Sequence, residues 1–190
     1  MALNTTLRRS ELLGLQWKHV DLYSDIPTIR IQQSKTSAGE RRIPLNRDAL
    51  VAFHQLRERC ETFVQVEGSE VNEVLPEHYV FPTCEHGHVD VRKPMKSWKT
   101  AWTNLKRAAG LERVRFHDLR HSAITNLLES GQSDQVVTDI AGHVSRRMLQ
   151  RYSHIRLKAK HAALSRLERH GKSESTESIR QEEEAISLLI

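Results

Sequence analysis

Long apolar segments are absent from this 190-residue sequence. No run of eighteen or more apolar residues is available to cross a membrane, and the first residues, MALNTTLRRSELLG, lack the apolar region of a secretory signal. These absences argue against a membrane-spanning or secreted protein, and they predict a cytoplasmic one with no membrane partner. No internal repeat is visible either, which argues against a solenoid.

Cysteine is scarce, with only Cys60 and Cys84 in the chain. Two cysteines are too few for a disulfide framework, so we expect both to be reduced thiols. Cys84, His86 and His88 are conceivable zinc ligands, but no second ligand pair at finger spacing accompanies them. The sequence CEHGH is more simply the tip of a hairpin, and we expect no metal site there.

Positive charge is plentiful and unevenly placed. The chain holds 29 Lys and Arg against 24 Asp and Glu, a net charge of +5. Residues 173–190 contain five Glu and one Arg, so their −4 leaves +9 on residues 1–172. Such a basic excess is typical of nucleic-acid-binding domains, although charge alone leaves a merely soluble basic protein open.

The periodicity of the sequence predicts a mainly helical domain with a small antiparallel sheet near its N-terminus. A short helix follows Ser10, with Arg8 at its start, and ends near residues 14–17. The alternating segments TIRIQQ and ERRIPL form a hairpin with Lys35 at its turn. A helix over residues 46–66 follows, whereas residues 67–94 have mixed polarity and no period. We expect that stretch to be an exposed connection with one short strand at residues 78–81.

Further helices are predicted in the second half of the chain. One covers residues 95–110 and another residues 117–131, each ended by a glycine. A shorter helix runs from Ser133 as N-cap to Gly142 as stop signal. Residues 155–171 form a basic amphipathic helix, and the rest is a polar linker ending in AISLLI. The length of 190 residues fits one domain with a substantial core.

Six side chains are suited to chemistry on an anionic phosphodiester: Arg8, Lys35, His117, Arg120, His143 and Tyr152. Taken singly, each is most often structural or merely exposed. His117 and Arg120 are three residues apart in a helix, so both project from one face and can converge on one ligand. Tyr152 stands among arginines rather than among apolar neighbours, which favours an anionic ligand close to it.

These residues, in this order, resemble the tyrosine recombinase (phage integrase) family. TLRRSELLGL is similar to the first arginine box of the family, SKT to its hairpin lysine, HDLRHSAIT to its HxxR box, and AGHVSRRMLQRYSH to its terminal histidine and tyrosine box. The resemblance implies a catalytic arginine pair, Arg8 and Arg120, with Lys35 as acid, His117 and His143 as histidines and Tyr152 as nucleophile. Glu11 is implied as a supporting carboxylate. We expect DNA contacts from a further group of arginines, namely Arg9, Arg41, Arg42, Arg146, Arg147 and Arg151.

The chemistry of phosphodiester attack is consistent with this set. Two arginines can stabilise the charge that grows on the non-bridging oxygens. Tyr152 needs a proton acceptor, for which His117 is suited, and the leaving oxygen needs a proton, which Lys35 can supply. The sequence contains neither a paired-carboxylate set typical of two-metal nucleases nor a GxxxxGK[ST] loop. We therefore expect no metal and no cofactor.

The resemblance also implies the organisation and the partners of the protein. Residues 1–170 are expected to form a DNA breaking and rejoining domain of the tyrosine recombinase or type IB topoisomerase kind, with residues 171–190 as linker and tail. Its expected partners are double-stranded DNA and further copies of itself, as a tetramer on DNA, in a prokaryotic or phage setting. Topoisomerase-like nicking and resealing is one alternative, and a truncated, non-catalytic DNA-binding remnant is another.

The sequence departs from the family pattern at three places. Thr6 stands where the family usually has glycine, which is expected to alter the backbone before Arg8. The sequence begins almost at the first box, so we expect a fragment of a longer protein or the product of a truncated gene. Val144, Met148 and Leu149 replace small hydroxyl residues of the final box without touching the catalytic positions.

Overall fold

The computed structural model describes residues 1–32, 40–66, 73–142 and 144, and five further helical residues, Leu157, Lys160, His161, Leu164 and Ser165. Within this part, short elements come first: α1 (Ala2–Thr5), α2 (Arg9–Leu13) and the 3-10 turn η1 (Trp17–His19). No helix in the described part is long and apolar enough to span a bilayer.

A three-stranded antiparallel sheet follows, in the order β1 (Val20–Asp21), β2 (Thr28–Ile31) and β3 (Arg41–Pro44). The predicted hairpin is therefore confirmed, with Ile29 opposite Ile43 and Arg30 opposite Arg42. The isoleucines are buried while both arginines are exposed, as the alternation along each strand requires. The two-residue strand β1 was not predicted because it is too short to show an alternating pattern.

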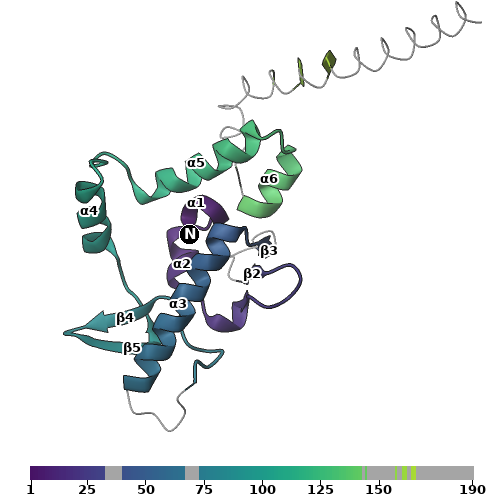
Figure 1. Cartoon of the computed structure of the whole chain (residues 1–190). Helices are drawn as coiled ribbons and strands as arrows, with labels where there is room; N and C mark the ends of the chain where they lie inside the picture. The colour runs from purple at the N-terminus through teal and green to yellow at the C-terminus, as the bar shows by residue number, and fades with distance from the viewer. Residues whose placement is uncertain are drawn as a thin grey trace, which may run out of the picture.

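The main core lies between this sheet, α2 and the long helix α3 (Arg47–Val66). Phe53 of α3 is completely buried, and Leu50, Leu56 and Phe63 pack against the same core, so the predicted apolar face is confirmed. Figure 1 shows α3 running through the middle of the molecule, between the first sheet and a second hairpin.

The second hairpin corrects the prediction for residues 67–94. In place of an exposed connection, β4 (Pro82–Glu85) pairs with β5 (His88–Pro94), and Val74, Val80 and Val91 are buried. The strand expected at residues 78–81 is wrong as well, because Tyr79 makes only an isolated bridge with Gln16.

CEHGH does form a hairpin tip. His86 and Gly87 have φ angles of 52° and 81°, the two positive values that tight two-residue turns need. The alternation of Val89 and Val91 was the available signal for β5.

Three helices complete the described fold: α4 (Lys99–Ala108), α5 (Phe116–Glu129) and α6 (Asp134–Ala141). In Figure 1, α4 lies to one side of the molecule and α5 lies above α1, while α6 packs against α5 and β3. α4 buries no residue of its own, and the rings of Trp98 and Trp102 hold it against Phe116, at centroid distances of 4.9 and 5.4 Å. A second apolar cluster joins α5 to α6 through Ile124, Leu128 and Val137.

The ends of α6 follow the predicted signals. The Ser133 hydroxyl accepts a hydrogen bond from the Val136 amide at 3.3 Å, so Ser133 is the N-cap. Gly142, with φ of 71°, ends the helix. This helix end lies beside β3 and beside the turn between α1 and α2, where the candidate site is built.

Candidate active site

Glu11 is the carboxylate around which the site is organised. Its Oε2 accepts a hydrogen bond from the Arg8 amide at 2.8 Å, and its Oε1 accepts one from Arg8 Nη1 at 2.8 Å. The spacing explains the local structure, since a carboxylate three residues after the N-cap can reach back to the N-cap amide. α2 thus begins at a position where Arg8 is held by its own helix.

Arg41 of β3 binds the same carboxylate from the opposite side. Its Nη2 and Nη1 donate to Oε2 and Oε1 of Glu11 at 2.9 and 3.1 Å, a two-pronged contact. Only 6% of the Arg41 side chain and 9% of the Glu11 side chain are exposed, against 34% for Arg8. Burial alone would raise the pKa of Glu11, but the hydrogen bonds from Arg41 and Arg8 outweigh it, so the pKa is lowered and Glu11 is ionised at neutral pH.

Arg120 of α5 lies still deeper, with 3% of its surface exposed. Its Nη1 donates to the carbonyl of Thr6, and its Nη2 donates to the carbonyl of Ala141 at 2.7 Å. Burial, and next the positive charge of Arg8, lower the pKa of Arg120 to about 10. The group remains protonated at neutral pH, and its hydrogen bond to the Thr6 carbonyl holds it to the backbone two residues before Arg8.

Charge is therefore unbalanced in this cluster. Arg8 and Arg41 form ion pairs with Glu11, and the buried guanidinium of Arg120 bonds two nearby backbone carbonyls, so these four described side chains together carry an excess of two positive charges. Confining like charges in a partly buried place is unfavourable unless an anion joins them. The arrangement is suited to a singly or doubly charged anion such as a phosphate group.

The same arginines cap the C-terminus of α6. The last carbonyls of a helix lack hydrogen-bond partners within the helix. Here Arg41 Nε donates to the Ile140 carbonyl at 2.9 Å, and Arg120 Nη2 donates to the Ala141 carbonyl. A Cβ on Gly142 would come within 3.1 Å of Arg41 Nη1, so the guanidinium would have to shift slightly, and the positive φ disfavours any residue other than glycine. Gly142, which lies against Arg41, directly precedes His143 in the sequence.

His117 lies one turn before Arg120 on α5 and is largely exposed. Its ring meets that of His121 edge to face, with centroids 4.8 Å apart. Partial burial, followed by the positive charges of His121 and Arg120, lowers the pKa of His117 below its usual 6.5. At neutral pH the imidazole is uncharged and can accept a proton. His121 was missed from the sequence, although its spacing of four residues from His117 was a usable signal.

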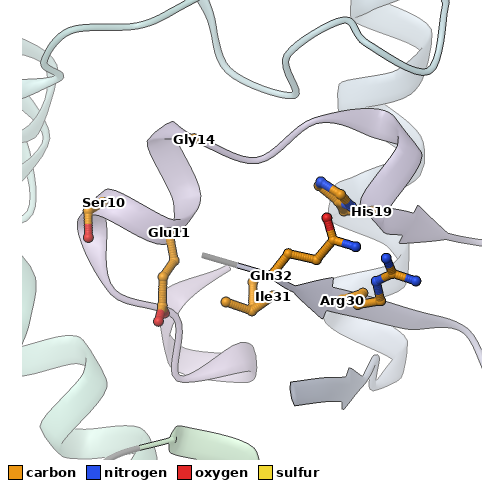
Figure 2. Close-up of a pocket in the computed structure, with 7 residues that line it drawn as sticks. All are labelled: Ser10, Glu11, Gly14, His19, Arg30, Ile31 and Gln32. Carbon is orange, nitrogen blue, oxygen red and sulfur yellow. The ribbon is translucent and has the colours of Figure 1, made fainter. Parts of the chain in front are cut away.

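A small cavity of about 90 Å³ lies beside Glu11, between α2 and the C-terminal end of β2. Figure 2 shows Ser10 and Glu11 on the helix side and His19, Arg30 and Gln32 gathered on the strand side. Burial, and then the charges of Lys18 and Arg30, lower the pKa of His19, so it is neutral at pH 7. The cavity connects the carboxylate to the strand that leads toward Lys35.

Some of the predicted site residues lie close together in the structure, and others fall outside its described part. Arg8, Glu11 and Arg120 are gathered around one centre, and His117 is on the same helix as Arg120. Arg41, expected on the DNA-binding surface, instead has its guanidinium inside the cluster, while Arg9 and Arg42 are exposed. Six predicted residues lie outside the described part of the chain: Lys35, His143, Arg146, Arg147, Arg151 and Tyr152.

Comparison with known proteins identifies the family. The sequence pattern of the phage integrase family matches residues 1–158. The chain belongs to the phage integrase family. The expected membership is thus confirmed, and so is the fold class, which is that of tyrosine recombinase catalytic domains, mainly helical with small antiparallel sheets.

Two curated relatives and one solved structure illustrate the likeness. The shufflon-specific DNA recombinase of Escherichia coli is 30% identical over 158 residues, covering 82% of this chain and 33% of the relative. The integrase of Salmonella phage P22 is 32% identical over 156 residues, covering 81% and 37%. This integrase-family chain therefore spans little more than a third of the length of these relatives.

The structure of the Tn1549 transposon integrase (aa 82-397) in complex with circular intermediate DNA has a TM-score of 0.59 to this chain. It is 21% identical and covers 87% of this chain and 57% of that one, a likeness that concerns the fold.

Proposed function

We propose that this chain is the catalytic domain of a site-specific DNA recombinase, which breaks and rejoins strands through a 3′-phosphotyrosyl intermediate. The observation that carries the proposal is the partly buried arginine cluster with its excess of two positive charges. Membership of the phage integrase family supports the same reading. Residues 1–170 form this domain in the proposal, and residues 171–190 form the linker and tail.

The reaction is a transesterification that balances without a cofactor. The Tyr152 hydroxyl oxygen attacks the phosphorus atom, a new bond from phosphorus to the tyrosine oxygen forms, and the bond from phosphorus to the 5′-oxygen breaks. His117 accepts the tyrosine proton, and Lys35 delivers a proton to the leaving 5′-oxygen. Rejoining is the reverse, with a 5′-hydroxyl attacking and Tyr152 leaving, so no external energy source is needed.

Each described side chain has a part in this scheme. Arg8 and Arg120 bind the non-bridging oxygens, where negative charge grows during attack, and their guanidinium groups are placed before the substrate arrives. Glu11 and Arg41 keep that pair in place, since Glu11 bonds Arg8 directly and Arg41 fixes Glu11 to the end of α6. His143, directly after this helix end, is the second histidine of the phosphate site.

Double-stranded DNA is the proposed partner, bound by a set of copies of the chain that we expect to be a tetramer. The Tn1549 integrase has been solved with DNA, and the basic excess of residues 1–172 is suited to phosphate contacts. Arg9 and Arg42 are exposed and are proposed to contact the DNA backbone, together with Arg146, Arg147 and Arg151. We expect the duplex to meet the face that carries the exposed His117 and the partly exposed Arg8.

Covalent trapping on DNA tests the proposal. The full chain is incubated with a nicked suicide duplex carrying the attachment sites of related elements, and the adduct is resolved on a denaturing gel. Wild type should form the adduct, whereas Tyr152→Phe should form none while binding DNA as tightly, because it loses a nucleophilic oxygen and no charge. An adduct that persists in the Phe variant would assign the nucleophile to another residue. DNA binding by wild type without any adduct would favour a non-catalytic remnant.

A further inference from the structure

Thr6, between α1 and α2, has an unusual backbone conformation for its residue type. Its φ and ψ are 55° and 11°, in the left-handed region, and only 2% of its surface is exposed. Left-handed geometry is rare for a β-branched residue, because Cβ crowds the neighbouring carbonyl. Such a conformation persists only where surrounding contacts hold it, so the contacts of Thr6 are of interest.

The carbonyl and the hydroxyl of Thr6 are both directed at the candidate site. Its carbonyl accepts a hydrogen bond from Arg120 Nη1, and its hydroxyl donates one to the Ile140 carbonyl at 3.3 Å. The Ile140 carbonyl also accepts from Arg41 Nε, at 2.9 Å. Thr6 therefore joins three places far apart in sequence: the residues just before Arg8, the middle of α5 and the end of α6.

We propose that Thr6 is a positioning residue, whose hydroxyl holds the end of α6, and hence the approach to His143, in register with Arg8 and Arg120. The proposal rests on the proposed function, since the register matters for strand cleavage. The physical reason is the short connection: Thr6 is two residues before Arg8, and Ile140 is three residues before His143. If α6 shifted by a fraction of an ångström, the end of the helix that leads to His143 would move relative to Arg8 and Arg120, which bind the same phosphate in the proposed function.

Three substitutions separate the hydroxyl from the shape and the backbone of Thr6. Thr6→Val keeps the branched shape and removes the hydroxyl, Thr6→Ser keeps the hydroxyl, and Thr6→Gly removes the side chain while relaxing the left-handed backbone. The Ile140 carbonyl keeps Arg41 as a partner in all three, so folding should survive, and thermal denaturation of each variant checks this.

Adduct formation on the suicide duplex is then measured across DNA concentrations. Thr6→Val should lower the rate at saturating DNA by about five- to tenfold, the effect of one lost hydrogen bond, with little change in the DNA concentration giving half the maximal rate. Thr6→Ser should restore the rate to within about twofold of wild type. Thr6→Gly should behave like Val. A Val or Gly variant as fast as wild type would overturn the proposal, because the hydroxyl would then be irrelevant.

Amide hydrogen exchange keeps the test independent of catalysis. Ala141 and Gly142 should exchange faster in Thr6→Val than in wild type, and Thr6→Ser should match wild type. If wild type formed no adduct, the proposed recombinase function would fail while this readout still decided whether the Thr6 hydroxyl holds α6. Equal exchange in Val and wild type would refute the positioning role even in an active enzyme.

Discussion

Replacing Glu11 by Gln should be among the most damaging single-atom changes in this protein. The carboxylate accepts two hydrogen bonds from the 6%-exposed Arg41 and two from Arg8, and it forms ion pairs with both guanidinium groups. Gln keeps one acceptor oxygen, but its NH₂ group would face the N–H donors of Arg8 and Arg41 and could not accept a hydrogen bond from them. Removing one partner of a buried pair costs about 3–5 kcal/mol, and because Arg8 is 34% exposed we expect the lower end, about 3 kcal/mol.

Urea denaturation followed by tryptophan fluorescence measures this loss. With a typical urea dependence, about 3 kcal/mol corresponds to a midpoint lower by roughly 1–2 M. Glu58→Gln, an exposed carboxylate on α3, is the matched control and should change the free energy of unfolding by less than about 0.5 kcal/mol. A Glu11→Gln variant whose free energy of unfolding lies within about 0.5 kcal/mol of wild type would refute the proposed role of Glu11 in the cluster.

The pH dependence provides a second check on Glu11. Its folded-state pKa is lowered from 4.5, so its stabilisation is complete above about pH 4.5 and is lost as pH falls through the lower folded-state value. The difference in unfolding free energy between wild type and Glu11→Gln should therefore be constant near neutrality and shrink in acid. A difference that stays constant down to the acid transition would mean that the charge of Glu11 is not what stabilises the fold.

Three further predictions concern the chemistry and the end of α6. Lys35→Ala should slow cleavage of ordinary DNA far more than cleavage of DNA with sulfur in place of the leaving 5′-oxygen, because a thiolate leaves without a proton; an equal defect on both substrates would assign Lys35 to DNA positioning. Because the pKa of His117 is lowered, the wild-type cleavage rate should be level near pH 7 and fall only below about pH 6.5. A rate that already falls between pH 8 and pH 7 would contradict the role of His117 as a neutral proton acceptor. Gly142→Ala should lower the melting temperature more than Gly110→Ala, since both glycines have positive φ but only at Gly142 would the new Cβ meet Arg41; equal losses would dismiss that contact.

Local patterns in the sequence were sufficient for most elements. The alternation around β2 and β3, the apolar face of α3, and the Ser133 and Gly142 signals of α6 each predicted an observed feature. These features depend on neighbours within a few residues, which a sequence displays directly. The β4–β5 hairpin was missed because charged and histidine residues interrupt its pattern, and because its burial depends on packing against α3.

Residue type and spacing predict the candidate catalytic side chains and their order, and the same motifs were enough to identify the family. The folded arrangement alone shows that Arg41 lies inside the site, that Thr6 has a left-handed backbone, and that Arg120 and Arg41 cap α6. These contacts join residues 21 to 134 positions apart. Local periodicity cannot predict contacts between residues so far apart in the sequence. They form when packing brings β3, α5 and α6 together, because charges and carbonyls buried there are stable only when they are hydrogen-bonded.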